Sequence, residues 1–294
     1  MCGIEGRRAL GQRFDVAAEA YDAARSGYPA RLVDRAIDRG GLTTGSRVLE
    51  IGCGSGKLTD ALVARGFRID AIDPGPNMLA IAQRRFREMG AITFHLGRFE
   101  EVEFPEEAFD GVFSATAFHW VDPAVGWAKA ARHLKAGALL ALLSHINVRN
   151  ERAGPVQDEF VTLLRKYAPE VARKWRQFLE LDVLMTGAEE RRANPSEVWD
   201  WLLQGGLERP TLTVAEAATL YEDVETTSEA YTVEMTADES LALFRTTALY
   251  HRLDPVQRQR LEECERRMIE RLGGTVCSAG AVVLMTARRS PRRL

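Results

Sequence analysis

Three glycines alternate with other residues in the stretch RVLEIGCGSGKLTDAL, which covers residues 47–62. They are Gly52, Gly54 and Gly56, and they separate a short apolar run containing Glu50 from a segment typical of a helix. Glycine lets a backbone adopt positive φ angles and approach another molecule closely, at an entropic cost. The spacing therefore indicates that this turn holds a ligand.

The class of that ligand depends on what surrounds the glycines. A dinucleotide or another adenosyl ligand would suit a strand, a glycine turn and a helix. The pyrophosphate fingerprint G-x-G-x-x-G needs a third glycine where this chain has Lys57, so the pattern here is G-x-G-x-G instead. Asp73 closes the next apolar run, where a carboxylate accepts hydrogen bonds from ribose hydroxyls. These residues favour a ligand with a ribose over one with a pyrophosphate.

Strand and helix patterns alternate through this half of the chain, and the strands are almost continuously apolar. That alternation predicts an α/β fold with a mostly parallel sheet covered by helices on both faces. The predicted strands are residues 47–51, 68–73, 92–97, 109–115 and 138–145, and the predicted helices between them are residues 57–66, 76–90 and 122–137.

The flanking segments complete a single domain. Residues 14–25 are helix-like, the pattern breaks at Ser26-Gly27, and a second helix should run from Pro29 to the pair Gly40-Gly41. Residues 281–289 predict a closing strand, which needs neighbours in the sheet. We therefore expect an N-terminal helical cover (residues 1–44), a doubly wound Rossmann-like core (45–146 and 251–294) and an α-rich lid inserted into it (147–250).

Composition narrows the class of protein. The 294 residues include 39 basic and 42 acidic side chains, for a net charge of −3, with 46% hydrophobic and 28% charged residues. These values are ordinary for a globular domain and lack the basic footprint of a nucleic-acid binder. No apolar run is long enough for a membrane span, and the N-terminus lacks the apolar core of a signal peptide. Cys2, Cys53, Cys264 and Cys277 form no CxxC pair, so we expect no metal site and a cytoplasmic location.

A family resemblance rests on five stretches in order. VLEIGCGSGKLT resembles the first motif of class I S-adenosylmethionine-dependent methyltransferases, and AIDPGPNML, HLGRFEEVEF, FDGVFSATAFHWVDP and ARHLKAGALLALLS match later ones, over about residues 48–145. The flanks resemble a small-molecule, type 11-like branch whose N-terminus follows FDxxAxxYDxxRPxYP, with Ser26 where that branch has proline. The resemblance implies the class I fold, S-adenosyl-L-methionine as cofactor and S-adenosyl-L-homocysteine as product.

The same resemblance assigns cofactor contacts to positions of this sequence. It implies that Glu50 orients the glycine turn through backbone amides and that Asp73 holds the ribose diol. The remaining cofactor positions of the core are Gly52, Cys53 and Gly54 at the methionine part, Met78, Arg98 and Phe99 around the adenine, and Ser114 and Ala115 near the sulfonium. Tyr21, Arg25 and Tyr28 belong to the N-terminal cover, with Arg25 a candidate partner for the methionine carboxylate.

The sequence says less about the residues that bind the methyl acceptor than about those that bind the cofactor. His119 follows the fourth strand. It is the candidate general base, because histidine titrates near neutral pH, and it could equally be a packed or hydrogen-bonded residue in the wall of the pocket. Trp120 is a candidate wall with a cation–π contact to the sulfonium. Trp175 and Trp199 are candidate substrate contacts from the lid, with packing in the core as the alternative. The acceptor atom (O, N or C) stays open, as does an anionic or natural-product substrate.

Two other functions remain open at this point. A non-catalytic, regulatory S-adenosylmethionine-binding module would keep the cofactor residues without an acceptor cavity. A nucleic-acid methyltransferase would need a basic surface, which the slightly acidic balance disfavours. We expect a small-molecule substrate, no nucleic-acid or membrane partner and no resident metal. The sequence leaves open the oligomeric state and whether scattered acids bind Mg²⁺ beside a phosphorylated substrate.

Overall fold

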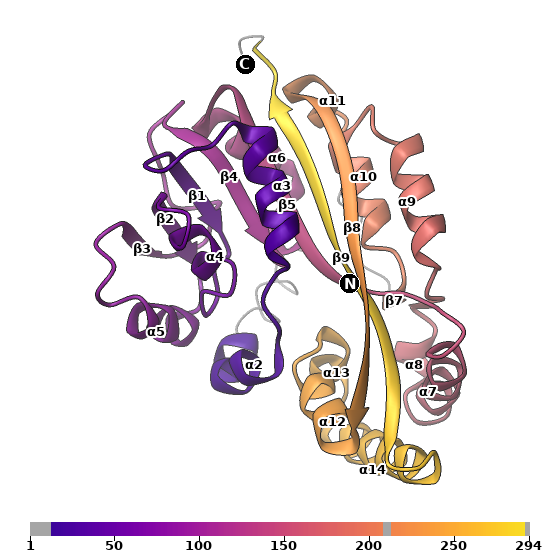
Figure 1. Cartoon of the computed structure of the whole chain (residues 1–294). Coiled ribbons are helices and arrows are strands. Elements are labelled where there is room, and N and C mark those ends of the chain that lie inside the picture. The colour runs from indigo at the N-terminus through magenta and orange to yellow at the C-terminus, as the bar shows by residue number, and fades with distance from the viewer. Residues whose placement is uncertain (1–12, 208–212, 292–294) are drawn as a thin grey trace.

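The apolar runs form the centre of a seven-stranded sheet in the computed structural model, which describes residues 13–207 and 213–291 (Figure 1). The strand order is β3-β2-β1-β4-β5-β9-β8. The first five strands pair in parallel, and β9 is antiparallel to both of its neighbours. The sheet consists of β1 (Arg47–Ile51), β2 (Arg68–Asp73), β3 (Ile92–Leu96), β4 (Phe109–Ala115), β5 (Leu134–Asn147), β8 (Tyr221–Thr236) and β9 (Thr275–Arg289).

Helices cover both faces of the sheet, because its central strands are apolar on both sides. One face is packed by α3 (Ala30–Gly40), α4 (Thr59–Val63) and α5 (Pro76–Arg85), which contribute buried residues such as Val33, Leu62 and Leu79. The other face is packed by α6 (Pro123–His133), α9 (Leu181–Glu190), α10 (Pro195–Leu202) and α11 (Ala217–Leu220). The predicted doubly wound class of the fold is confirmed.

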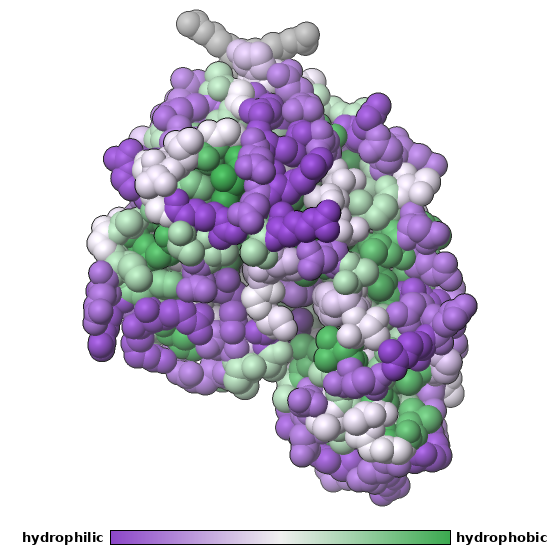
Figure 2. All heavy atoms as spheres, in the orientation of Figure 1, coloured by the Kyte–Doolittle hydropathy of each residue, from purple (hydrophilic) through white to green (hydrophobic). Residues whose placement is uncertain are grey.

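Two long strands carry a second group of helices away from the sheet. β8 and β9 pair along their whole length, but β5 reaches only as far as Gly280 of β9. Beyond that point they meet a helical lobe, which is visible below the sheet in Figure 1 and as a protrusion in Figure 2. We use that name for α7 (Gly154–Tyr167), α8 (Pro169–Ala172), α12 (Ala237–Arg245), α13 (Ala248–Arg252) and α14 (Pro255–Arg271), which share an apolar cluster.

Several predicted elements have different extents in the structure. The helix expected over residues 57–66 is only α4, Thr59–Val63, and the fifth strand reaches Asn147. Pro29 stands just before α3 as its N-cap, and Gly41 ends that helix with a φ of 59°. The break at Ser26-Gly27 is present, because α2 (Ala18–Ala24) ends before it.

The segment 147–250 contains more than helices. Its residues 221–236 form β8, the edge strand of the main sheet, and β6 (Trp175–Arg176) pairs with β7 (Gly206–Leu207) in a separate two-stranded sheet. The division into cover, core and lid therefore stays a prediction, with β8 counted in the sheet. None of the helices in the two described ranges is long and apolar enough to cross a membrane.

Candidate functional site

The glycine turn and Asp73 meet at the carboxyl ends of β1 and β2. The N–H of Gly54 donates to one Asp73 carboxylate oxygen at 2.8 Å, and the N–H of Gly75 donates to the other at 2.8 Å. Each oxygen keeps a lone pair beyond these bonds, so the carboxylate can accept two more donors. A vicinal diol has two such donors. The position at the ends of parallel strands is also where open α/β sheets bind ligands.

The surroundings of Asp73 disfavour the ionised form of its carboxyl group. Burial is the largest effect and raises the pKa of Asp73 to about 6, against the two backbone N–H groups that lower it. The nearby Asp15 carboxylate raises the pKa of Asp73 further. A half-buried acid with a raised pKa at the end of a strand is typical of a binding or catalytic site.

The glycines of the turn differ in what surrounds them. Gly52 has a φ of +70°, and a Cβ there would lie 2.3 Å from the Cβ of Ala117. Gly54 has a φ of +54°, and no atom lies within 4 Å of its Cβ position. Gly52 is therefore required by close packing, whereas Gly54 faces open space beside Asp73. Cys53 between them is buried, and burial raises the pKa of its thiol, which keeps that thiol neutral.

Glu50 does not hold the glycine turn directly. Its carboxylate accepts the hydroxyl proton of Thr59 at 2.7 Å, so it anchors the start of α4 instead of the backbone amides of the glycines. The structure thus pairs Glu50 with Thr59, whereas the resemblance implied the backbone amides of the glycine turn. Burial raises the pKa of Glu50 to about 8, with the Asp73 charge adding to the rise and the Thr59 hydrogen bonds opposing it.

The side chains expected around the adenine and the sulfonium turn mostly inward. Met78 is buried against the N-terminal segment, and Phe99 is buried with its ring 6.2 Å from that of His133. Arg98 forms an ion pair with Glu100 at 3.2 Å. Ser114 is fully buried and donates to the carbonyl of Ile51 at 2.7 Å, which ties the ends of β4 and β1 together. Ala115 and Arg98 are half-buried, whereas Met78, Phe99 and Ser114 are buried.

The cover residues lie close to these strand ends. Tyr21 is half-buried, and the charge of Asp73 is among the effects that raise its pKa, after burial. Tyr28 shares a hydrogen bond of 2.8 Å with the hydroxyl of Thr116. Arg25 donates to the hydroxyl and the carbonyl of Thr246 at 3.0 Å each, so the lobe holds it. Two of its five N–H donors are used there, and the others are compatible with the predicted carboxylate contact.

His119 and Trp120 form a short turn after β4, named η1 (Phe118–Trp120). His119 is 8% exposed, and its ring lies 4.9 Å from that of Trp120. Trp120 is half-buried, and Phe14 of the N-terminal segment packs edge-on against it at 5.6 Å. Both residues thus follow the strand whose end lies beside the glycine turn, as the sequence predicted.

The two other tryptophans are placed away from the strand ends. Trp199 on α10 is fully buried in the core cluster between the helices and the sheet. The prediction that it contacts a substrate is corrected, because a side chain with no exposed surface packs the core. Trp175 lies in β6 beside the helical lobe, with its ring near Phe160 and Phe178. The structure does not bring it together with Asp73 or His119.

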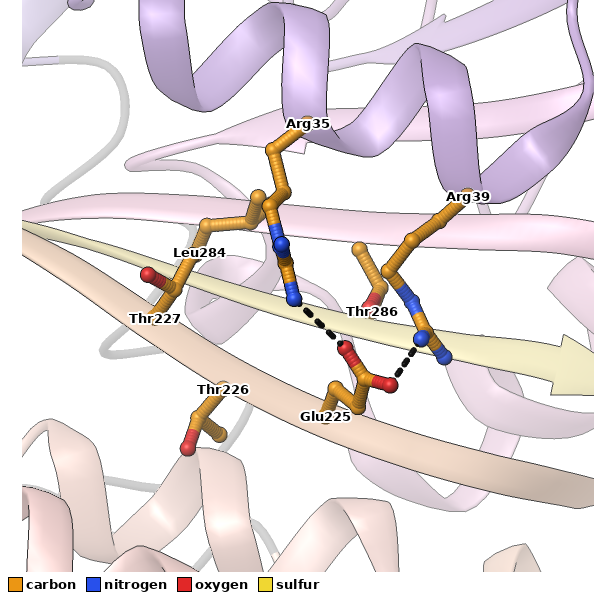
Figure 3. Close-up of a pocket in the computed structure, with 7 residues that line it drawn as sticks. All are labelled: Arg35, Arg39, Glu225, Thr226, Thr227, Leu284 and Thr286. Atoms are coloured by element: carbon orange, nitrogen blue, oxygen red, sulfur yellow. Dashed lines mark hydrogen bonds and ion pairs between the residues drawn. The ribbon is translucent and has the colours of Figure 1, made fainter.

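A separate pocket lies between α3 and β8, far along the sheet from the glycine turn. Figure 3 shows Arg35 and Arg39 pointing at the Glu225 carboxylate, which pairs with Arg35 at 3.2 Å and also with Arg39. Arg39 also pairs with Asp223 at 2.9 Å. The carboxylates of β8 therefore neutralise both arginines of the pocket, and these ion pairs connect α3 to β8.

Several residues at the strand ends were missed by the sequence analysis. They are Asp15, Asp22, Ser55, Thr116, His145 and Tyr231, which make hydrogen bonds around the site. The carboxyl ends of parallel strands lie at the same edge of a sheet, where ligands bind. His145 lies at the end of the fifth predicted strand, so this rule could have identified it as a site residue. Across residues 13–207 and 213–291, no cluster of three or more His, Cys, Asp or Glu side chains is arranged to hold a metal ion.

Part of the chain that contains this site is similar to known methyltransferases. Residues 49–142 match the family model described as a methyltransferase domain. An uncharacterised methyltransferase of Mycobacterium tuberculosis is 37% identical over 152 residues, which are 52% of this chain and 59% of that protein. A malonyl-[acyl-carrier protein] O-methyltransferase of Serratia marcescens is 32% identical over 114 residues, which are 39% of this chain and 43% of that protein. The chain thus spans less than two thirds of the length of these relatives.

Solved structures share the fold at lower identity. A protein assigned as a type II methyltransferase from Anaeromyxobacter dehalogenans has a TM-score of 0.56 and 20% identity, covering 91% of this chain and 99% of that one. The cyclase SpnF has a TM-score of 0.51 and 15% identity, covering 96% and 95%. The predicted resemblance is confirmed over residues 49–142, which match the methyltransferase-domain model, and the described chain shares its Rossmann-like fold with these solved structures.

Proposed function

We propose that this protein transfers a methyl group from S-adenosyl-L-methionine to a small molecule. The observation that carries the proposal is the pair of Asp73 and Gly54 at the ends of β1 and β2. Asp73 offers two carboxylate oxygens that already accept one backbone N–H each, and Gly54 leaves the space beside them open. The family match over residues 49–142 supports the same cofactor.

The residues around Asp73 fit an adenosyl group. The carboxylate would accept the two ribose hydroxyls, and the bare backbone of Gly54 would let the methionine part pass close to the turn. When bound, the cofactor supplies an electrophilic methyl group on a positively charged sulfur. The electron-rich ring of Trp120 follows β4 on the same side and would favour a positive charge nearby.

The chain's own contribution to the reaction is then mainly positioning. Residues 13–28 bond to the strand ends through Asp15, Asp22 and Tyr28 and would exclude water from the bound cofactor. A nucleophile held in line with the methyl group then needs little further activation. For a hydroxyl or neutral amine acceptor, we propose that its lone pair attacks the methyl carbon while the carbon–sulfur bond breaks and leaves its electron pair on the sulfur, and that His119 takes the proton that the acceptor loses. We assign acceptor binding to the segment 147–250 without β8, and a cytoplasmic location on the composition.

Methyl transfer can be tested with methyl-labelled S-adenosyl-L-methionine and a panel of phenols, carboxylic acids, amines and activated-carbon acceptors. Wild-type protein should transfer label to at least one class, and Asp73→Asn should transfer at least tenfold less at subsaturating cofactor. Asp60→Asn is the matched control, because Asp60 is an exposed acid on α4 beside the same turn.

Two results would favour the other functions. Tight cofactor binding without transfer to any class would support a non-catalytic binding module. Transfer to a nucleic-acid substrate would contradict the small-molecule proposal, which the net charge of −3 supports.

A further inference from the structure

The N-terminal segment of residues 13–28, which we call the cover segment, crosses the carboxyl ends of four strands. Asp15 accepts the N–H groups of Asn77 and Met78 at 2.9 and 3.0 Å, where α5 begins after β2. Asp22 accepts the hydroxyl proton of Ser55 in the glycine turn at 2.6 Å. Tyr28 and Gly27 then bond to Thr116, directly after β4, and to His145 on β5. Figure 1 shows α2 between the sheet and the helical lobe, and α2 contacts α12 of that lobe.

His145 on β5 holds the last part of the cover segment. Its Nε2 lies 3.1 Å from the carbonyl oxygen of Gly27. A carbonyl can only accept, so Nε2 carries the proton and donates. The neutral ring then presents the lone pair of Nδ1 to the hydroxyl of Tyr231, which lies 3.3 Å away on β8. The ring of Tyr28 packs against the same imidazole at 5.1 Å.

Thr116, the residue directly after β4, bonds to both Tyr28 and His145. Its hydroxyl oxygen lies 2.8 Å from the hydroxyl of Tyr28 and 3.4 Å from the backbone N–H of His145, which donates to it. Thr116 has a φ of +54°, which is rare for a β-branched residue. Such strained positions persist where surrounding contacts hold them, and they cluster at functional sites. In this backbone conformation the Thr116 hydroxyl bonds to Tyr28 of the cover segment.

The charge state of His145 agrees with this arrangement. Burial lowers the pKa of His145, the Gly27 hydrogen bond opposes that effect, and the positive charge of Arg25 lowers it further. The imidazole is therefore neutral at pH 7 and keeps one tautomer. The titratable and charged groups that face it are Tyr28, Tyr231 and Arg25.

We propose that His145 is a positioning residue that, together with Thr116, fixes Gly27 and Tyr28 of the cover segment over the strand ends and so slows release of the bound cofactor. The contacts of His145 with Gly27 and of Thr116 with Tyr28 do not depend on which ligand binds. The identity of the ligand under the cover segment rests on the proposed function. His145 acts through the cover and does not touch the reacting atoms.

Hydrogen exchange in the cofactor-free protein tests the positioning directly. His145→Ala removes the donor to Gly27, and Tyr28→Phe removes the bond to Thr116. Because one such bond is worth roughly a threefold to tenfold change in an opening equilibrium, amides of residues 18–25 should exchange faster by that factor in both variants. His145→Gln should restore protection, because its amide N–H can donate to the same carbonyl.

A matched control separates this role from a general loss of stability. Tyr221→Phe removes a buried hydroxyl bond of 2.8 Å, to the carbonyl of Trp127, at the far end of β8. It should lower the melting temperature about as much as Tyr28→Phe and leave exchange of residues 18–25 unchanged. Equal exchange in wild type and His145→Ala, or failure of His145→Gln to restore protection, would overturn the proposal.

The dissociation rate of S-adenosyl-L-homocysteine gives a second readout. In His145→Ala this dissociation rate should rise by the same factor as the exchange rate. In His145→Gln it should return to the wild-type value. If wild type does not bind this ligand but exchange responds as expected, the proposed function fails and the positioning role stands. If the ligand binds and neither exchange nor dissociation responds, the positioning role fails alone.

Discussion

Asp73 and Gly54 show how two residues define the proposed ligand. The carboxylate is fixed by two backbone N–H groups, so its orientation does not depend on the ligand. The glycine beside it has a positive φ and no neighbour in the direction of a side chain. Both residues were predicted from spacing alone, because a glycine turn and the acid at the end of the next strand are local sequence features. The partner of Glu50 was not, because it depends on where α4 begins.

Alanine at the two glycines should separate packing from binding. Gly52→Ala adds strain and a contact of 2.3 Å with Ala117, so we expect a loss of about 3 kcal/mol in the free energy of unfolding. Gly54→Ala adds strain alone, about 1 kcal/mol, but its methyl group enters the proposed cofactor space. Urea unfolding and S-adenosyl-L-homocysteine titration should show the larger stability loss in the first variant and a loss of affinity of at least tenfold in the second. Unchanged affinity in Gly54→Ala would place the ligand elsewhere.

Glu50 should make the protein less stable as pH rises. Burial raises the pKa of Glu50 to about 8 in the folded protein, whereas in the unfolded chain it stays near 4.5. Between these values the folded state binds more protons than the unfolded state, so the free energy of unfolding falls as pH rises and the loss is complete above about pH 8.

Glu50→Gln cannot ionise and should flatten this dependence. The variant should gain about 5 kcal/mol relative to wild type as the pH rises from 4.5 to 8, because each unit of pKa shift is worth about 1.4 kcal/mol. Denaturant unfolding at a series of pH values measures the difference, and Gln can still accept the Thr59 hydroxyl proton. Parallel profiles for the two proteins would mean that Glu50 is ionised in the folded state.

At the scale of elements, the sequence predicted the central strands well and the edge poorly. The fourth strand occupies the predicted residues 109–115, because its apolar run is sharply bounded. β8 was missed, because YEDVETTSEAYTVEMT mixes glutamates with β-branched residues and lies at a half-exposed edge. Its strand conformation comes from pairing with β9, a contact between distant parts of the chain. The approach of residues 13–28 to four strand ends is equally non-local.

Substitution of Trp199 tests whether this side chain packs the core or contacts the methyl acceptor. Its side chain is fully buried between α10 and the sheet. Trp199→Ala should therefore cost about 3–5 kcal/mol in the free energy of unfolding and leave cofactor affinity of the folded protein unchanged. Urea unfolding followed by circular dichroism measures this cost. A loss below about 1 kcal/mol, with weaker binding of a methyl acceptor, would contradict the core assignment and restore the predicted substrate contact.

At the scale of the whole molecule, the sheet and the helical lobe meet over the proposed site. The cover segment connects them, since it bonds to the strand ends on one side and, through Arg25, to Thr246 of the lobe on the other. A ligand held at Asp73 would therefore be enclosed by parts of the chain that are far apart in sequence. Binding should stabilise the whole protein, because the ligand binds only the folded state.

The most direct test of the account is isothermal titration with S-adenosyl-L-methionine and S-adenosyl-L-homocysteine. Wild type and Asp60→Asn should bind both with micromolar affinity, and Asp73→Asn, measured at a temperature where it is fully folded, should bind at least tenfold more weakly. Wild-type affinity should also fall as the pH drops below about 6, where Asp73 takes up a proton. Absence of binding by folded wild type, or equal binding by Asp73→Asn, would contradict the central claim.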